Sequence, residues 1–202
     1  PLIGDTRVVV QFDYEKGSFV GSPAILKANG TWIASFDVKI YPHFNAPESW
    51  ETQIWVSKDD AKTWVYKASI KGVTWGSLFT VNNEIYLLGA GRANKRIVIS
   101  RMESLTEWTE PVVILNRFKE IHTGNVGVLV TEDKVQTCIK NGRKNGDVLV
   151  LYAFHKKDDL MKSWRVSNVA TEKLKTSNLV HSLFNLEFDA VRAEEGVLVP
   201  YG

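Results

Sequence analysis

The chain has 202 residues, of which 44% are hydrophobic and 24% charged, an ordinary composition for a globular protein with a core. Its 25 basic and 23 acidic residues leave a formal charge of +2, which gives no electrostatic footprint for nucleic acid or an anionic membrane surface. One cysteine, Cys138, excludes an internal disulfide within these residues, and no apolar run is long enough to cross a bilayer.

The N-terminal part of the chain predicts four β-strands in succession. Residues 22–28 and 31–37 are strand-like runs on either side of Asn29-Gly30, a dipeptide that predicts a hairpin with a type I′ turn. Two further runs follow at residues 51–57 and 64–70. The four runs together predict one antiparallel unit.

The same order of strands returns along the chain. The second unit is predicted at residues 77–81, 84–89, 96–100 and 108–114, and the third at 126–131, 134–140, 147–154 and 164–169. A Trp opens the last predicted strand of each unit, at Trp64, Trp108 and Trp164. A four-stranded unit that recurs every roughly 40–50 residues is typical of a β-propeller blade. The alternative is a β-sandwich or an irregular barrel.

The predicted fold is therefore all-β, a propeller of four-stranded antiparallel blades in a single partial domain over residues 1–202. The blades are predicted at about 18–72, 73–118 and 119–172, and an incomplete fourth at 183–202. No signal peptide is visible in a chain that begins at Pro1.

The segment SKDDAKTW, residues 57–64, lies in the tight connection between the third and fourth predicted strands. Asp59 is expected to accept hydrogen bonds from N–H groups of the turn, and the Thr63 hydroxyl to join them. Ser57 and Trp64 complete a pattern that resembles the Asp-box of sialidase-like propellers, S-x-D-x-G-x-T-W, with Ala61 in place of Gly. Weaker copies stand at residues 101–108 and 157–164.

The resemblance to the bacterial sialidase-like (Asp-box, or BNR-repeat) family extends along most of the chain, through residues 20–37, 75–91, 107–112, 122–130 and 158–168. It implies a carbohydrate-active protein with six blades, an Asp-box remote from the active site, and a periplasmic or secreted location. The chain supplies about three blades and begins a fourth. We therefore expect the ring to be completed by a missing C-terminal chain or by a second chain.

A meander determines which connections share an end of the blade. The first-to-second and third-to-fourth turns lie at one end, and the remaining loops at the other, which is where we expect a binding site. Three carboxylates are predicted at that end as catalytic candidates, since glycoside hydrolysis normally needs a pair: Asp37, Glu51 and Glu187. Glu187 lies in a stretch, residues 185–191, that loosely resembles the sialidase segment whose Glu activates a nucleophilic tyrosine. Each carboxylate could instead be a solvated strand-end residue.

Four residues at the same predicted end are candidates for binding a carbohydrate: Trp75, Arg92, His122 and Asn125. His122 could bind substrate or donate a proton near neutral pH, and equally could be a structural histidine. The fork of Arg92 could reach a carboxylate, although a solvated loop charge is the alternative. No His or Cys spacing predicts a metal site, and no cofactor is expected.

One departure from the family pattern argues against strict sialidase activity. The resemblance implies an Arg-Ile-Pro stretch at the start of the first blade, and this chain has Gly-Ser-Pro at 21–23. Three hypotheses follow, in order: a glycoside hydrolase of unassigned sugar specificity, a non-catalytic glycan-binding propeller, and an assembly module whose open blade edges pair with another chain.

Overall fold

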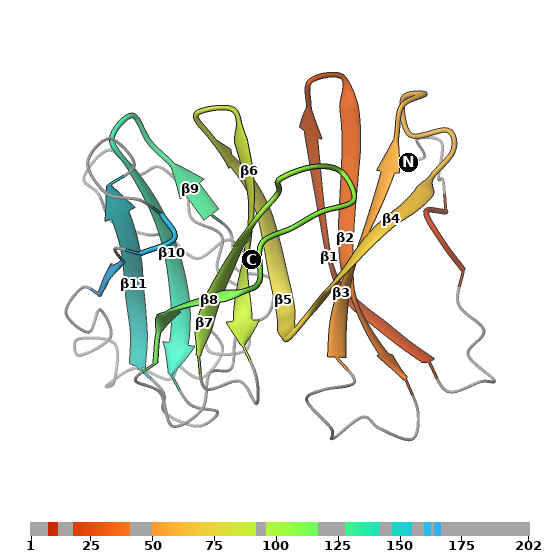
Figure 1. Ribbon diagram of the computed structural model, residues 1–202. Helices are drawn as coiled ribbons and strands as arrows, with labels where there is room; N and C mark the ends of the chain where they lie inside the picture. Colours follow the sequence, from red (N-terminus) through yellow and green to blue (C-terminus); the bar gives the residue numbers. More distant parts are fainter. Residues whose placement is uncertain are drawn as a thin grey trace, which may run out of the picture.

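The computed structural model describes residues 8–11, 18–40, 50–91, 96–116, 128–141, 147–154, 160–162 and 164–166. Within these residues the secondary structure consists of β-strands in three four-stranded antiparallel sheets (Figure 1). The prediction of an all-β fold built of four-stranded antiparallel blades is confirmed. No helix in this part of the chain is long and apolar enough to cross a membrane.

Each sheet is a meander in which neighbouring strands in the sequence are neighbours in the sheet. The first sheet contains β1 (Ser18–Ala28), β2 (Thr31–Ile40), β3 (Trp50–Ser57) and β4 (Val65–Lys71). The second contains β5 (Val73–Val81), β6 (Glu84–Gly91), β7 (Ile97–Arg101) and β8 (Val112–Leu115). The third contains β9 (Val128–Val130), β10 (Lys134–Asn141), β11 (Asp147–Phe154) and β12 (Arg165–Val166).

The hairpin turns have the backbone conformation that their sequences predict. Asn29 and Gly30 have φ of 48° and 74°, and Asn82 and Asn83 have φ of 50° and 65°. Two successive positive φ values define the type I′ turn, whose twist matches that of the strands it joins. These turns therefore set the register of β1 against β2 and of β5 against β6.

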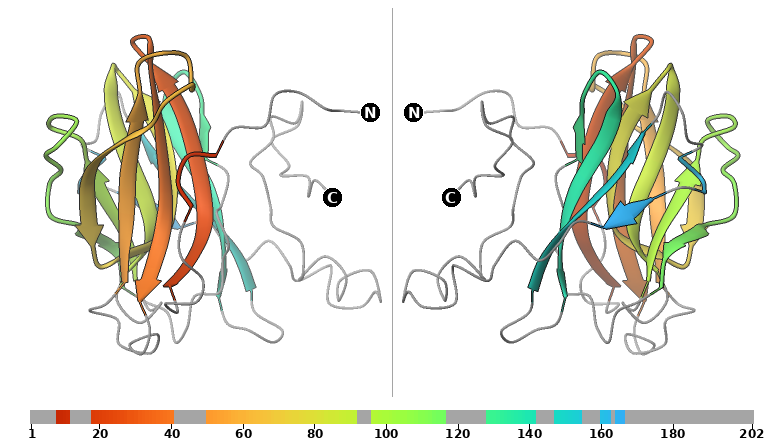
Figure 2. Two further views of the ribbon diagram at one scale, coloured as in Figure 1. Left: turned by 90° about the vertical axis from the view of Figure 1, so that its right-hand side faces the viewer. Right: turned by 90° about the vertical axis from the view of Figure 1, so that its left-hand side faces the viewer.

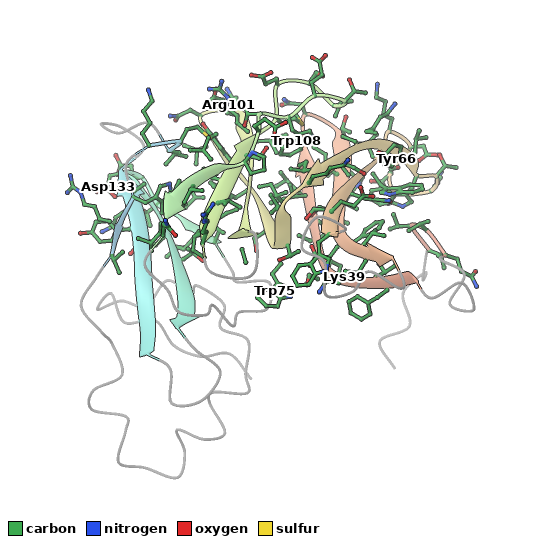
Figure 3. The ribbon with its side chains drawn as sticks, turned by 60° about the horizontal axis from the view of Figure 1, so that its bottom comes forward. Lys39, Tyr66, Trp75, Arg101, Trp108 and Asp133 are labelled. Carbon is green, nitrogen blue, oxygen red and sulfur yellow. The ribbon has the colours of Figure 1, made fainter. Side chains whose placement is uncertain are left out.

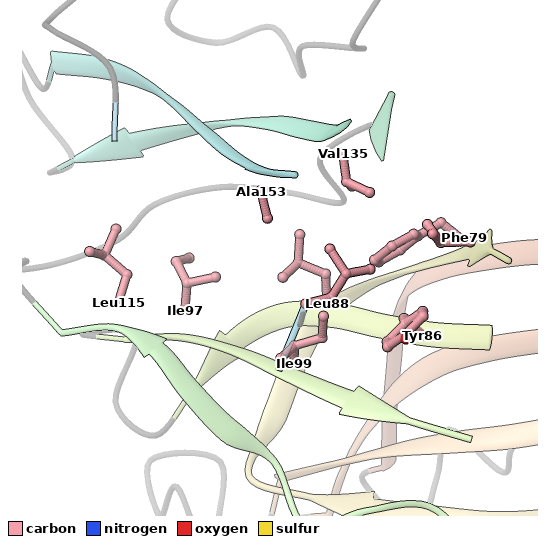
Figure 4. Close-up of a cluster of buried hydrophobic side chains, with 10 residues drawn as sticks. Phe79, Tyr86, Leu88, Ile97, Ile99, Leu115, Val135 and Ala153 are labelled. Carbon is pink, nitrogen blue, oxygen red and sulfur yellow. The ribbon is translucent and has the colours of Figure 1, made fainter. Parts of the chain in front are cut away.

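The three sheets pack side by side like blades of a propeller (Figures 1 and 2). Between the first and second sheets lies a cluster of buried aliphatic side chains: Ile33, Ile54, Val56, Ile70, Val73, Ile85, Leu87 and Val98. A second cluster lies between the second and third sheets, where Val135 and Ala153 face Leu88, Ile97 and Ile99 (Figure 4). Each fully buried Ile or Leu contributes roughly 1.5–3 kcal/mol, so these clusters hold the blades together.

The innermost strands are β1, β5 and β9, the first strand of each sheet, and they pack against one another in sequence. Two of them are interrupted at the same place. The register of β1 shifts between Gly21 and Ala24, and that of β5 shifts between Thr74 and Ser77. At these bulges Ser22 and Trp75 have φ of 52° and 54°, a strained conformation for residues other than Gly.

The connections divide between the two ends of the blades as the meander argument predicts. Figure 1 shows the β1–β2 and β5–β6 hairpins at the top, which we call the turn end, together with the β3–β4 connection. The β4–β5 connection through Gly72 lies at the bottom, which we call the loop end. The bulges at Ser22 and Trp75 lie on the half of β1 and β5 that is nearer the loop end.

Candidate functional site

A buried carboxyl group, Asp37, lies near the loop end of β2. It pairs with Gly21 of β1 on one side and Thr52 of β3 on the other, and its side chain is 1% exposed. The Trp75 backbone N–H donates to Asp37 Oδ2 at 2.8 Å, so this carboxylate points toward the second sheet. Asp37 thus connects the two innermost strands at the level of their bulges.

The hydrogen bonds around Asp37 join four strands: β1, β2, β3 and β5. The Ser22 hydroxyl at the β1 bulge hydrogen-bonds to the carboxylate, and Thr52 Oγ1 lies 3.2 Å from Oδ1. Thr52 Oγ1 also lies 3.0 Å from the Val73 carbonyl oxygen. Because a hydroxyl has one proton, Thr52 cannot donate to both oxygens at once. When Thr52 donates to Val73, its own oxygen can accept a hydrogen bond from the O–H of a neutral Asp37, so the network suits both charge states.

Burial raises the pKa of Asp37 from its ordinary value of 3.8 to about 6. Hydrogen bonds from Trp75, Ser22 and Thr52 act in the opposite direction, as does the positive charge of Lys39. Desolvation prevails because the carboxylate lies between two packed sheets. The group therefore changes its charge close to neutral pH, which is uncommon for an aspartate and typical of functional sites.

The second candidate carboxylate, Glu51, lies on the other face of the first sheet. Thr52 is the β3 residue opposite Asp37, and successive residues of a strand point to opposite faces. Glu51 accepts a hydrogen bond from Gln53 Nε2 at 3.0 Å, and Gln53 Oε1 accepts one from Trp55 Nε1 at 3.0 Å. The structure therefore places Glu51 and Asp37 on opposite faces of the first sheet.

A row of side chains continues the Asp37 face of the first sheet toward the loop end. Phe19, Lys39 and Trp50 are directly opposite one another on β1, β2 and β3. Lys39 Nζ lies 4.1 Å from the centroid of the Trp50 ring and 5.6 Å from that of the Phe19 ring. Burial lowers the pKa of the Lys39 ammonium, opposed by the negative charge of Asp37. The row is not apparent in the sequence, because its three residues come from three different strands.

Trp75, a predicted binding residue, contributes to the same region from the second sheet. Its ring is half-buried, and Figure 3 places it with Lys39 at the loop end, away from Arg101 and Trp108. Sequence reasoning missed the role of its backbone N–H as a partner of Asp37. The matching bulges, one at Gly21-Ser22-Pro23 and one at Trp75-Gly76, were a signal that an alignment of the two blades could have found.

The turn at residues 57–64 lies at the opposite end of the blade. Asp59 Oδ1 accepts from Ser57 Oγ at 2.7 Å and from Thr63 N at 2.9 Å, and Oδ2 accepts from Thr63 Oγ1 at 2.7 Å. The hydrogen bonds to Thr63 and Ser57 hold the pKa of Asp59 well below its ordinary value. Trp64 follows half-buried, directly before β4. These contacts close the turn, and both oxygens of the Asp59 carboxylate accept hydrogen bonds within it.

The remaining predicted site residues, Arg92, His122, Asn125 and Glu187, lie outside the described residues. So does the predicted fourth unit, residues 183–202. Within the described ranges no group of three or more His, Cys, Asp or Glu side chains could hold a metal ion. The described part of the candidate site therefore consists of Asp37 with its hydrogen-bond partners and the row beside it.

Comparison with known proteins defines the fold. No family model matches the chain, and no curated protein matches it by sequence. Solved structures do match. A GH43 β-1,3-galactosidase has a TM-score of 0.60 at 13% identity, over 76% of this chain and 33% of that one. The exo-β-1,3-galactanase of Phanerochaete chrysosporium has a TM-score of 0.58 at 16% identity, over 75% and 36%.

A family 117 glycoside hydrolase of the marine bacterium Zobellia galactanivorans also matches, with a TM-score of 0.57 at 14% identity, over 79% of this chain and 59% of that one. The chain thus spans between a third and three-fifths of the length of these three structures. The fold is that of the β-propeller glycoside hydrolases. Families 43 and 117 are five-bladed propellers, whereas the sialidase resemblance implied six blades. The similarity supports a glycoside-hydrolase-like propeller and does not extend to the sialidase-like family in particular.

Proposed function

We propose that this protein is a glycoside hydrolase that binds its carbohydrate substrate at the loop end of the propeller. The observation that carries the proposal is Asp37, a buried carboxyl with a pKa of about 6 that links the bulges of two innermost strands. Half-buried aromatic rings at the same end, Trp50 and Trp75, offer apolar faces on which a sugar ring can stack. The structural neighbours include a β-1,3-galactosidase and an exo-β-1,3-galactanase with bound galactose.

Within this proposal Asp37 is a positioning residue. Its side chain is 1% exposed and its oxygens are already hydrogen-bonded to Trp75, Thr52 and Ser22. A carboxyl buried in this way holds the innermost strands β1 and β5 in place and adds a charge that depends on pH. Exposed side chains around it would contact the substrate. Glu187, outside the described residues, stays the predicted catalytic carboxylate.

The test is release of sugar from a panel of galactosyl, arabinosyl and sialyl oligosaccharides, followed by a pH–rate profile on any substrate that turns over. Asp37→Asn should lower kcat/KM and remove the part of the profile that titrates near pH 6. Asp59→Asn, at the turn end, is the matched control and should leave the profile unchanged. An Asp37→Asn variant with the wild-type profile would contradict the positioning role.

A non-catalytic glycan-binding propeller is the second candidate. It is favoured by one observation: the described residues on the Asp37 face of the first sheet contribute a single carboxyl group at the loop end. Binding of an oligosaccharide without release of sugar during long incubation would support this candidate. Absence of binding to every member of the panel would contradict both candidates.

Sialidase activity would be a more specific function, and the first blade lacks the arginine that it implies. The position where the sialidase resemblance implies an arginine holds Gly21-Ser22-Pro23, and the Ser22 hydroxyl is already a partner of Asp37. Sialic acid should therefore be released no faster than neutral sugars from the panel, even where sialyl oligosaccharides bind.

We also propose that further blades complete the ring, supplied by additional C-terminal chain or by a second chain. The chain spans only part of each neighbouring structure, which supports this proposal. Intact mass spectrometry combined with light scattering on the native protein tests it. A covalent mass well above 22.8 kDa indicates additional chain, and a dimer of 22.8 kDa subunits indicates a second copy. A stable 22.8 kDa monomer would contradict it.

A further inference from the structure

Lys39 is a charged group placed among aromatic rings at the loop end. Its strand neighbours across the sheet are Phe19 and Trp50, and its ammonium lies over both rings, at 5.6 Å and 4.1 Å from their centroids. The Phe19 ring folds back over Gly21, because a Cβ built on Gly21 would lie 2.8 Å from Phe19 Cε1. The row therefore lies on the Asp37 face, which looks toward the second sheet.

The ammonium of Lys39 has unused hydrogen-bonding capacity. It carries three N–H donors, and among the described residues no oxygen accepts a hydrogen bond from it. The negative charge of Asp37 is close enough to raise the pKa of Lys39. The Asp37 oxygens, however, are hydrogen-bonded to Trp75, Thr52 and Ser22. A half-buried cation without an oxygen partner is a suitable binding group for an anion.

The rings around Lys39 are accessible to a ligand. The Phe19 side chain is 42% exposed, and Trp50 and Trp75 are half-buried. Trp75 comes from the neighbouring blade, and its backbone N–H is fixed by Asp37. Aromatic faces and one cation at the same end match a sugar that has an apolar ring face and an anionic substituent.

We propose that Lys39, with Phe19, Trp50 and Trp75, forms a subsite for an acidic sugar residue, in which the lysine binds a carboxylate or sulfate and the rings pack against the pyranose. This inference rests on the proposed carbohydrate function and specifies the class of its substrate. Two sources share the chemistry, a uronic acid and a sulfated sugar, and the experiment separates them.

The first measurement is the affinity of the protein for three probes by isothermal titration calorimetry: galactotriose, trigalacturonic acid and a sulfated galactotriose. At least one anionic probe should bind about tenfold more tightly than galactotriose, and raising the salt concentration should reduce that advantage. A preference for trigalacturonic acid identifies a carboxylate as the ligand group, and a preference for the sulfated probe identifies a sulfate.

The second measurement uses a variant that keeps the bulk of the side chain. Lys39→Met should remove the preference for the anionic probe while the affinity for galactotriose changes by less than about twofold, because the rings remain. Lys39→Arg should keep the preference. Lys27→Met is the matched control: Lys27 also lies over an aromatic ring, that of Trp32 at 4.7 Å, but it is at the turn end and ion-paired with Asp60 at 3.2 Å.

Two results would overturn the inference alone: equal affinity of the wild-type protein for all three probes, or a preference that survives in Lys39→Met. Failure of all three probes to bind, with no sugar released from the wider panel, would overturn the proposed function as well. If Lys39→Met does not fold, the salt dependence of the wild-type protein and the Lys39→Arg affinities still decide the question.

Discussion

Replacing Asp37 by Asn should make the folded protein more stable at neutral and alkaline pH. A carboxyl whose pKa is raised by burial costs folding free energy once it is ionised, because the unfolded chain ionises it without that penalty. A pKa of about 6 against an ordinary 3.8 corresponds to about 3 kcal/mol at roughly 1.36 kcal/mol for each pKa unit. The wild-type protein therefore has its full Asp37 contribution below pH 3.8 and loses it as pH rises through about 6.

Asn can replace the neutral acid in the same network. Its carbonyl oxygen can accept from the Trp75 N–H, and its NH₂ can donate to Thr52 Oγ1, which then donates to the Val73 carbonyl. Because no charge is buried, the stability of Asp37→Asn should not change between about pH 5 and about pH 8 through this site. The variant should exceed the wild type by up to about 3 kcal/mol at the higher pH.

Urea denaturation at about pH 5 and about pH 8, monitored by tryptophan fluorescence, measures the free energy of unfolding of both proteins. It therefore tests both the higher stability of Asp37→Asn and the loss of its pH dependence. For a chain of this length, about 3 kcal/mol corresponds to a rise of roughly 6–12 °C in Tm at the higher pH. A variant that is no more stable than the wild type at the higher pH, with the same pH dependence, would refute the reasoning. Asp37→Ala, which leaves Trp75 N–H without its acceptor, should be less stable than Asp37→Asn at both pH values.

Three further predictions concern the frame that holds the site. Ala61 has φ of 63°, so Ala61→Gly should relieve strain and raise the free energy of unfolding by about 0.5–1 kcal/mol in thermal denaturation; a fall would contradict it. Gly89→Ala should destabilise the second blade by about 1–3 kcal/mol, since its Cβ would lie 2.6 Å from the Thr74 carbonyl oxygen, and unchanged urea denaturation would refute this. Asp59→Asn should lower the free energy of unfolding above about pH 4 and match the wild type in acid, because hydrogen bonds of the turn stabilise Asp59 only while its carboxylate is ionised. An equal loss of stability at all pH values would contradict this.

The sequence by itself determined the strands, their order and the tight turns. Asn29-Gly30 and Asn82-Asn83 adopt positive φ because these residues tolerate it, and the hairpins they close fix the meander of each blade. Alternation of apolar and polar residues then decided which face of each strand packs against the next blade. The local sequence 57–64 likewise contains all the partners of Asp59 within seven residues of one another.

Only the tertiary structure decided the composition of the site. Whether Asp37 shares its face with Thr52 or with Glu51 depends on the register of β2 against β3, and a slip of one residue would exchange them. The loop between those strands leaves that register open in the sequence. The Trp75 N–H that binds Asp37 and the raised pKa of that carboxyl both depend on contact between two blades, since the residues that bind and bury the carboxylate are far apart in the chain. Such properties belong to the packed sheets, which no local pattern encodes.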